Sequence, residues 1–535
     1  KTALHYSKTN TNPVAMIRYG DSDNNLLTQE PCEVYRLMPT TPRLCLIVLL
    51  PVVLGLCVQA RAASSETFDT VISGGRVMDP ETQRDEIADV GIRHGKITRI
   101  SNTSLTGKVQ IDASGMVVAP GFIDIHSHTP TRLGEHLNVL DGITTQLDLE
   151  AGSYPPTDYG YQFAGGAQLN YGSSVGHFAI RGRVMDDSDQ SYFFSKRGFM
   201  SLSGRMWRDQ ATAAQITEMK LHLEQGLAMG GLGIGVLLDY MTDAVSEAEL
   251  RMIFETAAAF DKPVFIHVRR GMPGDSTGLD EVIALAEAHG TATLICHITH
   301  SAMGGIGQWL AKIDAANQRG ARITTETLSY LAGGTSIAAD VFVNRDWRAI
   351  FDIDYEDVQW VPTGEWLDEE RFLRYQRDFP ASSINHHYVK EEWLLEALAW
   401  PGMMVSTDAL PAFDLEVKTN PNIAGTYAHF LGRYVRDLEV MTLMEGLRRI
   451  TLLPAQWLAL ASKDFESKGR VQEGADADLV IFSAARIAAN AQYGDPYQPS
   501  DGIAHVFVAG RLVVKNGHQV EGRYPGKHLI SPLSP

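Results

Sequence analysis

Histidines and carboxylates stand at the ends of five short apolar runs in this 535-residue chain. The first run ends in a His-Ser-His motif at 126–128, and residues two apart in a strand share one face, so both imidazoles should point the same way. Neutral imidazoles and carboxylates suit Zn²⁺, and an open coordination position leaves room for water. The pattern predicts a zinc site with one or two ions per chain. The candidate ligands are His126, His128, Glu150, His267, His297 and Asp408.

The runs that carry these residues belong to an alternation of apolar strands and amphipathic helices. Helical patterns cover residues 246–260 and 279–288, among others. Strands that alternate with helices indicate parallel βαβ units, and eight of them indicate an α/β fold with a (β/α)8 barrel, which we expect over residues 119–469. Catalytic residues of such barrels lie at the carboxyl ends of the strands, where the candidate ligands fall. The predicted strands are residues 121–125, 143–149, 173–180, 233–238, 264–268, 293–298, 321–327 and 403–407.

Both ends of the chain beyond residue 62 are strand-like, with glycine turns. We therefore expect residues 63–118 and 470–535 to form one small composite β-sandwich domain beside the barrel. Residues 331–402 are too long for an ordinary connection. This insertion is either a lid over the site or a peripheral packing or oligomer-forming segment. His300, His386, His387 and His429 are interpreted as surface or supporting residues; of these, the pair at 386 and 387, within the insertion, is the one we expect to come closest to substrate.

Composition and the first 62 residues bear on the class of protein. Hydrophobic residues make up 44% of the chain, and a net charge of −18 without a long basic run speaks against a nucleic-acid partner. Residues 38–62 resemble a secretory signal peptide, with an apolar run too short for a membrane anchor. We expect an exported protein, periplasmic or secreted, and interpret residues 1–37 as an artefactual extension. After residue 62 only Cys296 remains, so we expect a buried packing thiol and no disulfide.

The stretch PGFIDIHSH at 120–128, followed by single histidines on the fifth and sixth strands and an aspartate on the eighth, resembles the amidohydrolase superfamily. VGHFAIR at 175–181, GLGIGVLLDY at 231–240 and GADADLVIF at 474–482 resemble its D-aminoacylase branch. The resemblance implies a zinc-dependent hydrolase that cleaves the amide bond of N-acyl amino acids, with the D configuration left open. It also implies a small-molecule substrate and a homo-oligomer.

Three positions depart from that branch. Ala151 stands where a metal-bridging cysteine is usual, which makes Glu150 the natural bridge; the alternative is that Glu150 only hydrogen-bonds beside the metal. Thr299 replaces a lysine that helps to bind substrate. The familiar Asp-Val-Tyr-Pro-Tyr stretch becomes residues 326–330, in which only Tyr330 remains. The acyl and amino-acid preferences should therefore differ from those of the well-known D-aminoacylases.

The resemblance also implies a role for each candidate residue of the site. The pair at 126 and 128 would hold one metal with Asp408, and His267 and His297 would hold a second, with Glu150 between them. Asp408 would be the general base that activates water and then protonates the leaving amine. The candidate substrate-binding residues are Arg269, Tyr240, Tyr330 and His177.

Several of these substrate-binding assignments have plainer alternatives. Arg269 lies two residues after His267, where its guanidinium would grip the substrate carboxylate; a salt bridge at the barrel rim is the alternative. Tyr240, at the tip of the fourth strand, would donate to the scissile carbonyl oxygen, or would simply pack. We expect His177, with Arg181, to support the pocket rather than to catalyse.

Two other functions are compatible with the sequence. A dipeptidase or carboxypeptidase-like amidase acting on aryl-acyl amino acids, such as ochratoxin, would use the same metal chemistry. A metal-free barrel that serves as a scaffold or binding protein comes from a different class. Metal content separates the scaffold from the enzymes, and an assay with D, L and aryl-acyl substrates separates the enzymes from each other.

Overall fold

The computed structural model describes residues 67–195 and 198–531. The expected signal peptide at 38–62 and the extension at 1–37 lie outside the described residues, and both stay predictions. Among the helices of the described ranges, none is long and apolar enough to cross a membrane.

An eight-stranded parallel sheet curves into a nearly closed barrel, as the alternation of strands and helices predicts. Neighbouring strands pair in the order β19-β14-β13-β12-β11-β8-β7-β6. The two edge strands are joined just beyond their ends by a parallel bridge between Ser127 and Ala409. The strands are β6 (Phe122–Asp124), β7 (Ile143–Ser153), β8 (Asn170–Gly176), β11 (Ile234–Leu237), β12 (Val264–His267), β13 (Thr293–Ile295), β14 (Ile323–Leu328) and β19 (Met404–Ser406).

Two of the predicted strands extend more than one residue past their true ends. The third is predicted over 173–180, but β8 ends at Gly176 and a helix begins at His177. The sixth is predicted over 293–298, but β13 ends at Ile295, and His297 has a left-handed backbone before the next helix. In both places an apolar run continues from strand into helix, and hydrophobicity alone does not mark where the backbone geometry changes.

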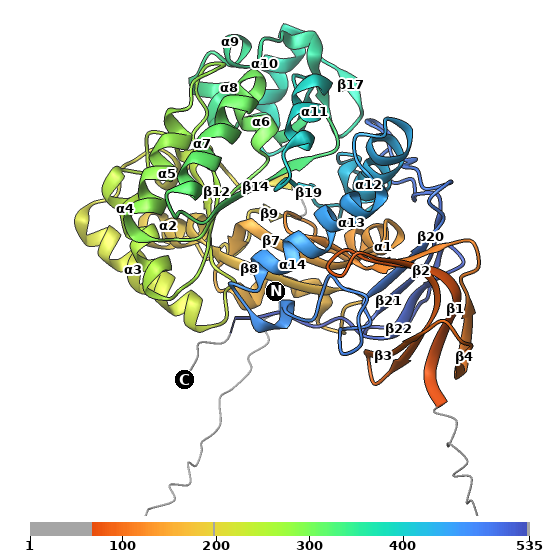
Figure 1. Cartoon of the computed structure of the whole chain (residues 1–535). Helices are drawn as coiled ribbons and strands as arrows, with labels where there is room; N and C mark the ends of the chain where they lie inside the picture. Colours follow the sequence, from red (N-terminus) through yellow and green to blue (C-terminus); the bar gives the residue numbers. More distant parts are fainter. Residues whose placement is uncertain (1–66, 196–197, 532–535) are drawn as a thin grey trace, which may run out of the picture. The chain divides into compact units, whose positions relative to one another are not determined.

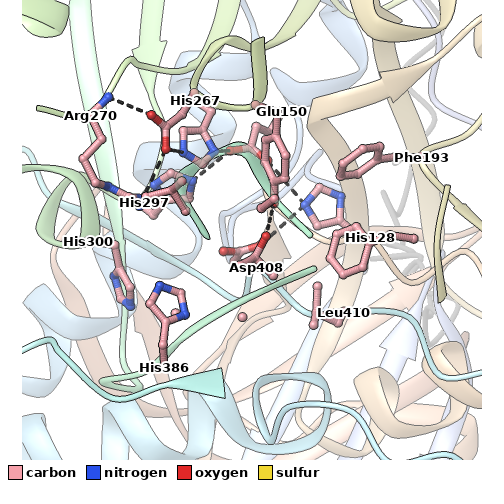
Figure 2. Close-up of a pocket in the computed structure, with 18 of the residues that line it drawn as sticks. His128, Glu150, Phe193, His267, Arg270, His297, His300, His386, Asp408 and Leu410 are labelled. Carbon is pink, nitrogen blue, oxygen red and sulfur yellow. Dashed lines mark hydrogen bonds and ion pairs between the residues drawn. The ribbon is translucent and has the colours of Figure 1, made fainter. Parts of the chain in front are cut away.

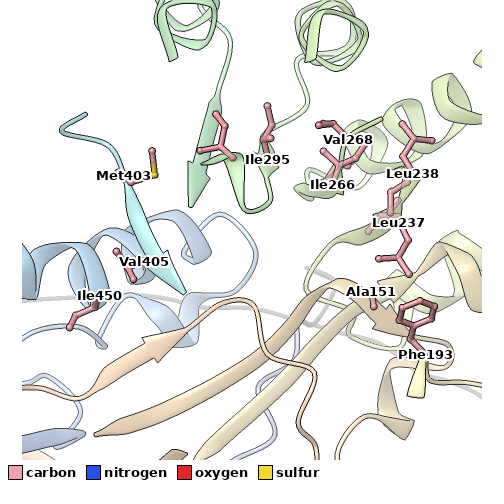
Figure 3. Packing of buried hydrophobic residues seen from close by; sticks show 14 of the residues in the cluster. Ala151, Phe193, Leu237, Leu238, Ile266, Val268, Ile295, Met403, Val405 and Ile450 are labelled. Carbon is pink, nitrogen blue, oxygen red and sulfur yellow. The ribbon is translucent and has the colours of Figure 1, made fainter. Parts of the chain in front are cut away.

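Alternate residues of the barrel strands pack on opposite sides of the sheet. Phe265 and Leu294 point into the barrel, where they join a cluster that includes the buried Cys296. Ile266 and Ile295, each one residue later, belong to the larger cluster between the strands and the helices (Figure 3). This period of two anchors each strand on both faces, so its carboxyl end is held at the barrel mouth.

Helices surround the barrel, and several begin at capping residues (Figure 1). The Ser246 hydroxyl accepts from the backbone N–H of Glu249 at the start of α4. The predicted helical patterns at 246–260 and 279–288 correspond to α4 and α5. The helices are α1 (Arg132–Leu140), α2 (His177–Asp186), α3 (Ala213–Ala228), α4 (Glu247–Ala259), α5 (Thr277–His289), α6 (Ile298–Ala302), α7 (Ile306–Gln318), α12 (Asn422–His429), α13 (Leu443–Ile450) and α14 (Leu452–Leu458).

Strands from both ends of the described chain form one nine-stranded sheet with a hydrophobic cluster of its own. The joint is the antiparallel pair of β5 and β20, in which Val118 faces Ile481. Figure 1 shows the first strands, in red and orange, beside the last ones, in blue. The strands are β1 (Thr67–Asp79), β2 (Arg84–Arg93), β3 (Lys96–Ser101), β4 (Thr106–Asp112), β5 (Val117–Pro120), β20 (Leu479–Phe482), β21 (Ile503–Val508), β22 (Arg511–Lys515) and β23 (His518–Gln519).

The insertion at 331–402 folds as a layer with its own four-stranded sheet and hydrophobic core (Figure 1, green to teal). Phe342, Phe351 and Ile384 pack together in that core. Thr335 and His386 of this layer line the cavity at the barrel mouth, so the insertion forms one of its walls. Its elements are β15 (Gly333–Ser336), α8 (Asp340–Asn344), α9 (Trp347–Phe351), β16 (Val358–Trp360), β17 (Glu365–Trp366), α10 (Glu369–Asp378), β18 (Ser383–His386) and α11 (Glu391–Ala399).

A buried ion pair joins the composite sheet to the barrel. Lys468 Nζ lies 2.6 Å from Asp478 and 3.1 Å from Asp476, and its side chain is 5% exposed. Asp478, just before β20, also accepts a hydrogen bond from Asn170 at the start of β8 (3.0 Å). Burial acts to lower the pKa of Lys468, but the two carboxylates raise it above its ordinary value, so the ammonium stays charged.

Lys468→Met should lower the free energy of unfolding by about 3–5 kcal/mol, because the buried carboxylate of Asp478 loses its cation. Chemical denaturation measures the change as a lower midpoint. Lys96→Met is the matched control. Lys96 lies 2.7 Å from Asp476 but is 44% exposed, so its loss should cost less than about 1 kcal/mol. Equal losses in the two variants would contradict the role of the buried pair.

Candidate metal centre

The barrel closes through the backbone of the residues that were predicted as ligands. The N–H of Asp408 donates to the carbonyl oxygen of His126 (2.7 Å), and the N–H of His128 donates to that of Ala409 (3.0 Å). These bonds connect the turn after β6 to the turn after β19. The hydrogen bonds that complete the barrel therefore also place three of the predicted ligands at its mouth.

The first group of ligand atoms consists of His126 Nε2, His128 Nε2, Glu150 Oε2 and Asp408 Oδ1. Figure 2 shows His128, Glu150 and Asp408 of this group. His126 Nε2 lies 3.3 Å from the Glu150 oxygen and 3.4 Å from the Asp408 oxygen. His128 Nε2 lies 3.5 Å and 3.4 Å from the same two atoms. Zinc ligands stand ~2.0–2.2 Å from the metal, so tetrahedral neighbours are roughly 3.3–3.6 Å apart. His126 Nε2 is buried without a hydrogen-bond partner in the described ranges, so these donors fit a zinc ion.

The second group consists of Glu150 Oε1, His267 Nδ1 and His297 Nε2. Glu150 Oε1 lies 3.1 Å from the His267 nitrogen and 2.8 Å from the His297 nitrogen. Each oxygen of Glu150 therefore faces a different histidine pair. That is the arrangement in which one carboxylate serves two adjoining metal positions.

Two further buried carboxylates, which the sequence analysis does not predict, orient the histidines from behind. Glu326 Oε1 lies 2.9 Å from His126 Nδ1 and also accepts from the backbone N–H of His297 (2.5 Å). Asp148 Oδ2 lies 2.9 Å from His128 Nδ1. A carboxylate behind an imidazole fixes its tautomer and leaves the other nitrogen free for a metal. The signal for both was an acid inside a fully or mostly buried strand, because a carboxylate is costly to bury without a partner.

Charge pairing keeps the two central carboxylates ionised. Burial acts to raise the pKa of Glu150, but His126 and His267 bring it well below its ordinary value. Burial acts on Asp408 in the same way, and His126 and His128 lower its pKa below the ordinary value. An ionised carboxylate is the form that binds a metal or accepts a proton.

Two of the predicted ligands have a strained backbone. His297 has a φ of 34° and Asp408 a φ of 46°, in the left-handed region that residues other than glycine seldom adopt. Each lies two residues after a barrel strand, β13 or β19. The sharp turn lets the chain leave the strand while the side chain stays over the barrel mouth.

A cavity lies beside the two groups of ligand atoms (Figure 2). Phe193, Phe194 and Phe199 line one side, the last two from β9 (Phe194–Ser195) and β10 (Gly198–Phe199). Tyr240 reaches the cavity as predicted, and its hydroxyl lies 2.6 Å from that of Thr335. Burial raises the pKa of Tyr240 far above its ordinary value, so the phenol stays protonated and can donate. The opposite side is polar and is formed by Arg270, His300 and His386.

Arg269 does not line the cavity, which corrects the expectation that it binds the substrate carboxylate. Its guanidinium donates to the carbonyl oxygens of Thr242 (2.9 Å) and Val245 (2.5 Å) and pairs with Glu281 of α5. β12 ends at His267, so the alternation of a strand does not extend to Arg269. The structure instead shows the alternative interpretation of Arg269, a salt bridge at the rim of the barrel, with Glu281 as the partner.

Tyr330 and His177 also lie away from the cavity, and their predicted contacts with substrate are corrected in the same way. Tyr330 donates its hydroxyl to the carbonyl oxygen of Ala491 (3.1 Å) and stacks on His429. His177 is fully buried at the start of α2, with Nε2 2.8 Å from Glu249. Each follows the end of a strand, where the chain turns away from the barrel mouth.

Cys296 lies close to the metal centre. Its Sγ and ligand atoms of His126 and Glu150 lie within 4.8 Å of one another. Burial raises the pKa of its thiol well above the ordinary value, and the charge of Glu150 adds to the effect. Cys296 also belongs to the hydrophobic cluster inside the barrel, where it packs with Phe265 and Leu294, as expected of a packing residue.

The model of the Amidohydrolase family matches residues 117–513, a range that includes the barrel and all six predicted ligands. The chain belongs to the amidohydrolase family. This amidohydrolase is accordingly a metal-dependent enzyme that acts on C–N amide bonds, as the sequence predicts.

Relatives of known activity and known structure are similar over nearly their whole length. An N-acyl-D-glutamate deacylase from Alcaligenes xylosoxydans xylosoxydans is 28% identical to this chain, over 84% of this chain and 94% of the deacylase. A D-aminoacylase from the same organism is 25% identical, over 87% of this chain and 97% of the D-aminoacylase. A D-aminoacylase crystal structure superposes with a TM-score of 0.72 at 24% identity, over 86% of this chain and 100% of that one. The N-acyl-D-glutamate deacylase from Bordetella bronchiseptica, solved with zinc and a phosphonate inhibitor, has a TM-score of 0.72 at 23% identity, over 87% and 100%.

These similarities confirm the predicted family and fold class. They support amide hydrolysis of N-acyl amino acids and give no support to the peptidase, the aryl-amidase or the metal-free scaffold. One similar D-aminoacylase structure is described as having a binuclear metal centre. Export and self-association are not tested by them and stay predictions.

Glu326→Gln should weaken metal binding roughly 10- to 100-fold, because His126 loses the carboxylate that fixes its ring. Dialysis against graded chelator concentrations, followed by elemental analysis, measures the metal retained. Glu281→Gln, which alters the partner of Arg269 outside the cavity, is the control and should retain metal like the wild type. Unchanged retention in Glu326→Gln would show that the carboxylate does not support a metal ligand.

Proposed function

We propose that this amidohydrolase is a zinc-dependent deacylase that hydrolyses N-acyl amino acids, with the D configuration preferred. The observation that carries the proposal is Glu150, whose two oxygens face two histidine pairs beside a cavity that Asp408 lines. The N-acyl-D-glutamate deacylase and the D-aminoacylase that match this chain support the substrate class.

We assign the first group of ligand atoms to one zinc ion and the second group to another, with Glu150 belonging to both. Imidazole and carboxylate donors suit zinc, and the carboxylates behind His126 and His128 hold the rings in place. When bound, zinc lowers the pKa of a water molecule and polarises the scissile carbonyl group. The protein residues then have to place the substrate and move protons.

Asp408 is the residue we assign to proton transfer. It lines the cavity, its carboxylate is ionised, and 17% of its side chain is exposed. It accepts a proton from the water that attacks the carbonyl carbon and donates that proton to the amide nitrogen as the C–N bond breaks. The two parts of one water molecule thus end on the released carboxylic acid and the free amino acid.

Tyr240 and the phenylalanines would position the substrate. The protonated phenol of Tyr240 can donate to the carbonyl oxygen, where negative charge increases as the water adds. Phe193, Phe194 and Phe199 offer an apolar surface for the acyl group, since burial of apolar area is favourable. This arrangement directs the leaving amino acid toward the polar side of the cavity.

Elemental analysis and one hydrolysis assay test the proposed function together. Protein purified without chelator should contain about one or two zinc ions per chain and should cleave N-acetyl-D-amino acids faster than the L forms. Metal with cleavage of only L or aryl-acyl substrates would make the enzyme a peptidase or amidase instead. Absence of both metal and activity, even after zinc is added, would overturn the metal site itself.

Asp408→Asn should lower kcat roughly 10²- to 10⁴-fold while the fold and most of the metal remain, because an amide cannot take up the proton. Turnover at saturating substrate, circular dichroism and metal content measure the three quantities. Asp414→Asn changes an exposed aspartate on the same loop and should leave kcat unchanged. Substantial turnover in Asp408→Asn would exclude Asp408 as the base.

A further inference from the structure

The polar side of the cavity carries buried nitrogen atoms without partners. Arg270, His300 and His386 lie together there, across the cavity from Phe193 (Figure 2). Both ring nitrogens of His300 and of His386, and the Nε of Arg270, are buried and make no hydrogen bond of ordinary geometry with the described residues. Buried polar groups are nearly always satisfied, so a cluster of unsatisfied ones on one wall indicates that a ligand completes them.

The buried Nε–H group of Arg270 is available to donate a further hydrogen bond. Its side chain is 7% exposed, and among the described residues that line the cavity it is the only lysine or arginine. Its guanidinium lies 3.6 Å from Asp239, a carboxylate that Arg345 already contacts at 2.9 Å. A planar guanidinium with free N–H groups matches the geometry of a carboxylate.

The two imidazoles of this wall are held in the neutral form. Burial, with His297 and Arg270 nearby, lowers the pKa of His300 to about 3. Burial also lowers the pKa of His386 well below its ordinary value, and Arg270 and His300 add to the effect. Both imidazoles are therefore neutral, and each can donate one N–H to a bound anion.

We propose that Arg270, His300 and His386 form the subsite for a carboxylate of the leaving amino acid. The inference rests on the proposed function, because it assumes that the substrate is an N-acyl amino acid. Three bonds separate the scissile carbonyl carbon from the α-carboxyl carbon, a reach of roughly 3–4 Å. The ring centres of His297 and His300 are 6.4 Å apart, so a carbonyl held beside His297 places the carboxylate at this wall.

Two other candidates for this task are engaged elsewhere. Arg269 is bonded to carbonyl oxygens and to Glu281 outside the cavity. Thr299, at the position of the lysine that the D-aminoacylase branch uses, is fully buried with its hydroxyl 2.7 Å from that of Thr327. The polar wall therefore replaces the lost lysine with a different set of donors.

The test compares pairs of substrates that differ by one charge, with acetate release as the readout. N-acetyl-D-alanine against N-acetyl-D-alaninamide examines the α-carboxylate. N-acetyl-D-glutamate against N-acetyl-D-glutamine examines a side-chain carboxylate. The wild type should prefer the charged member of at least one pair roughly 10- to 100-fold in kcat/KM, and that pair identifies the carboxylate recognised.

Arg270→Met and His386→Phe should each reduce this preference about tenfold or more. Methionine keeps most of the apolar stem at position 270, and Asp239 keeps its contact with Arg345. Phenylalanine fits at position 386 because the ring there already packs among aromatic side chains. Those neighbours are Phe342, Phe351 and Tyr388.

His387→Phe is the matched control, since its ring is adjacent in sequence but lies against Trp366 and Tyr493, with both ring centres 4.7 Å away. It should keep the wild-type preference. A preference that is unchanged in both Arg270→Met and His386→Phe would overturn the subsite. So would an equal loss in His387→Phe.

Calorimetric binding keeps this inference separate from the proposed function. If the wild type releases acetate from none of the four compounds, the deacylase proposal fails. The subsite still requires that N-acetyl-D-alanine or N-acetyl-D-glutamate bind the wild type at least about tenfold more tightly than Arg270→Met. Equal affinities of the two proteins for both compounds would overturn the subsite whatever the activity.

Discussion

The burial of Glu150 among four imidazoles is the constraint on which the rest of this structure depends. A carboxylate removed from water needs partners on both oxygens, and here each oxygen faces one histidine pair. The imidazoles in turn need fixed rings, which Glu326 and Asp148 provide from inside barrel strands. The centre can therefore assemble only when the strands have paired and the barrel has closed.

The predicted ligands could be found from the sequence because strand geometry is local and barrel geometry is regular. Parallel strands that close into a barrel bring all their carboxyl ends to one mouth, so the strand on which a residue lies is enough to place it. Residues as distant in sequence as His126 and Asp408 thus come within 3.4 Å of each other. Glu326 was not found because its contact with His126 depends on the order of the strands around the barrel, in which only β19 separates β14 from β6, and periodicity does not report that order.

The wrong substrate-binding assignments share one physical cause. Arg269, Tyr330 and His177 each lie one or two residues past the end of a strand, where the period of two no longer holds. Arg270, the next residue after Arg269, lines the cavity instead, and only the turn after β12 distinguishes the two. Strand interiors were predictable from hydrophobic alternation, whereas the direction of a side chain in a turn depends on backbone angles that the residue types do not determine.

The candidate metal ligands all come from the barrel, whereas the wall of the cavity comes partly from the inserted layer. His386 and Thr335 come from β18 and β15, which pair with each other and rest on a separate hydrophobic core. Amino-acid replacements within residues 331–402 can therefore reshape one wall of the cavity while the backbone hydrogen bonds between the barrel strands stay the same. Substitutions confined to this layer, in evolution or in a mutant library, can therefore change which substrates fit the cavity. The candidate metal ligands on the barrel stay the same.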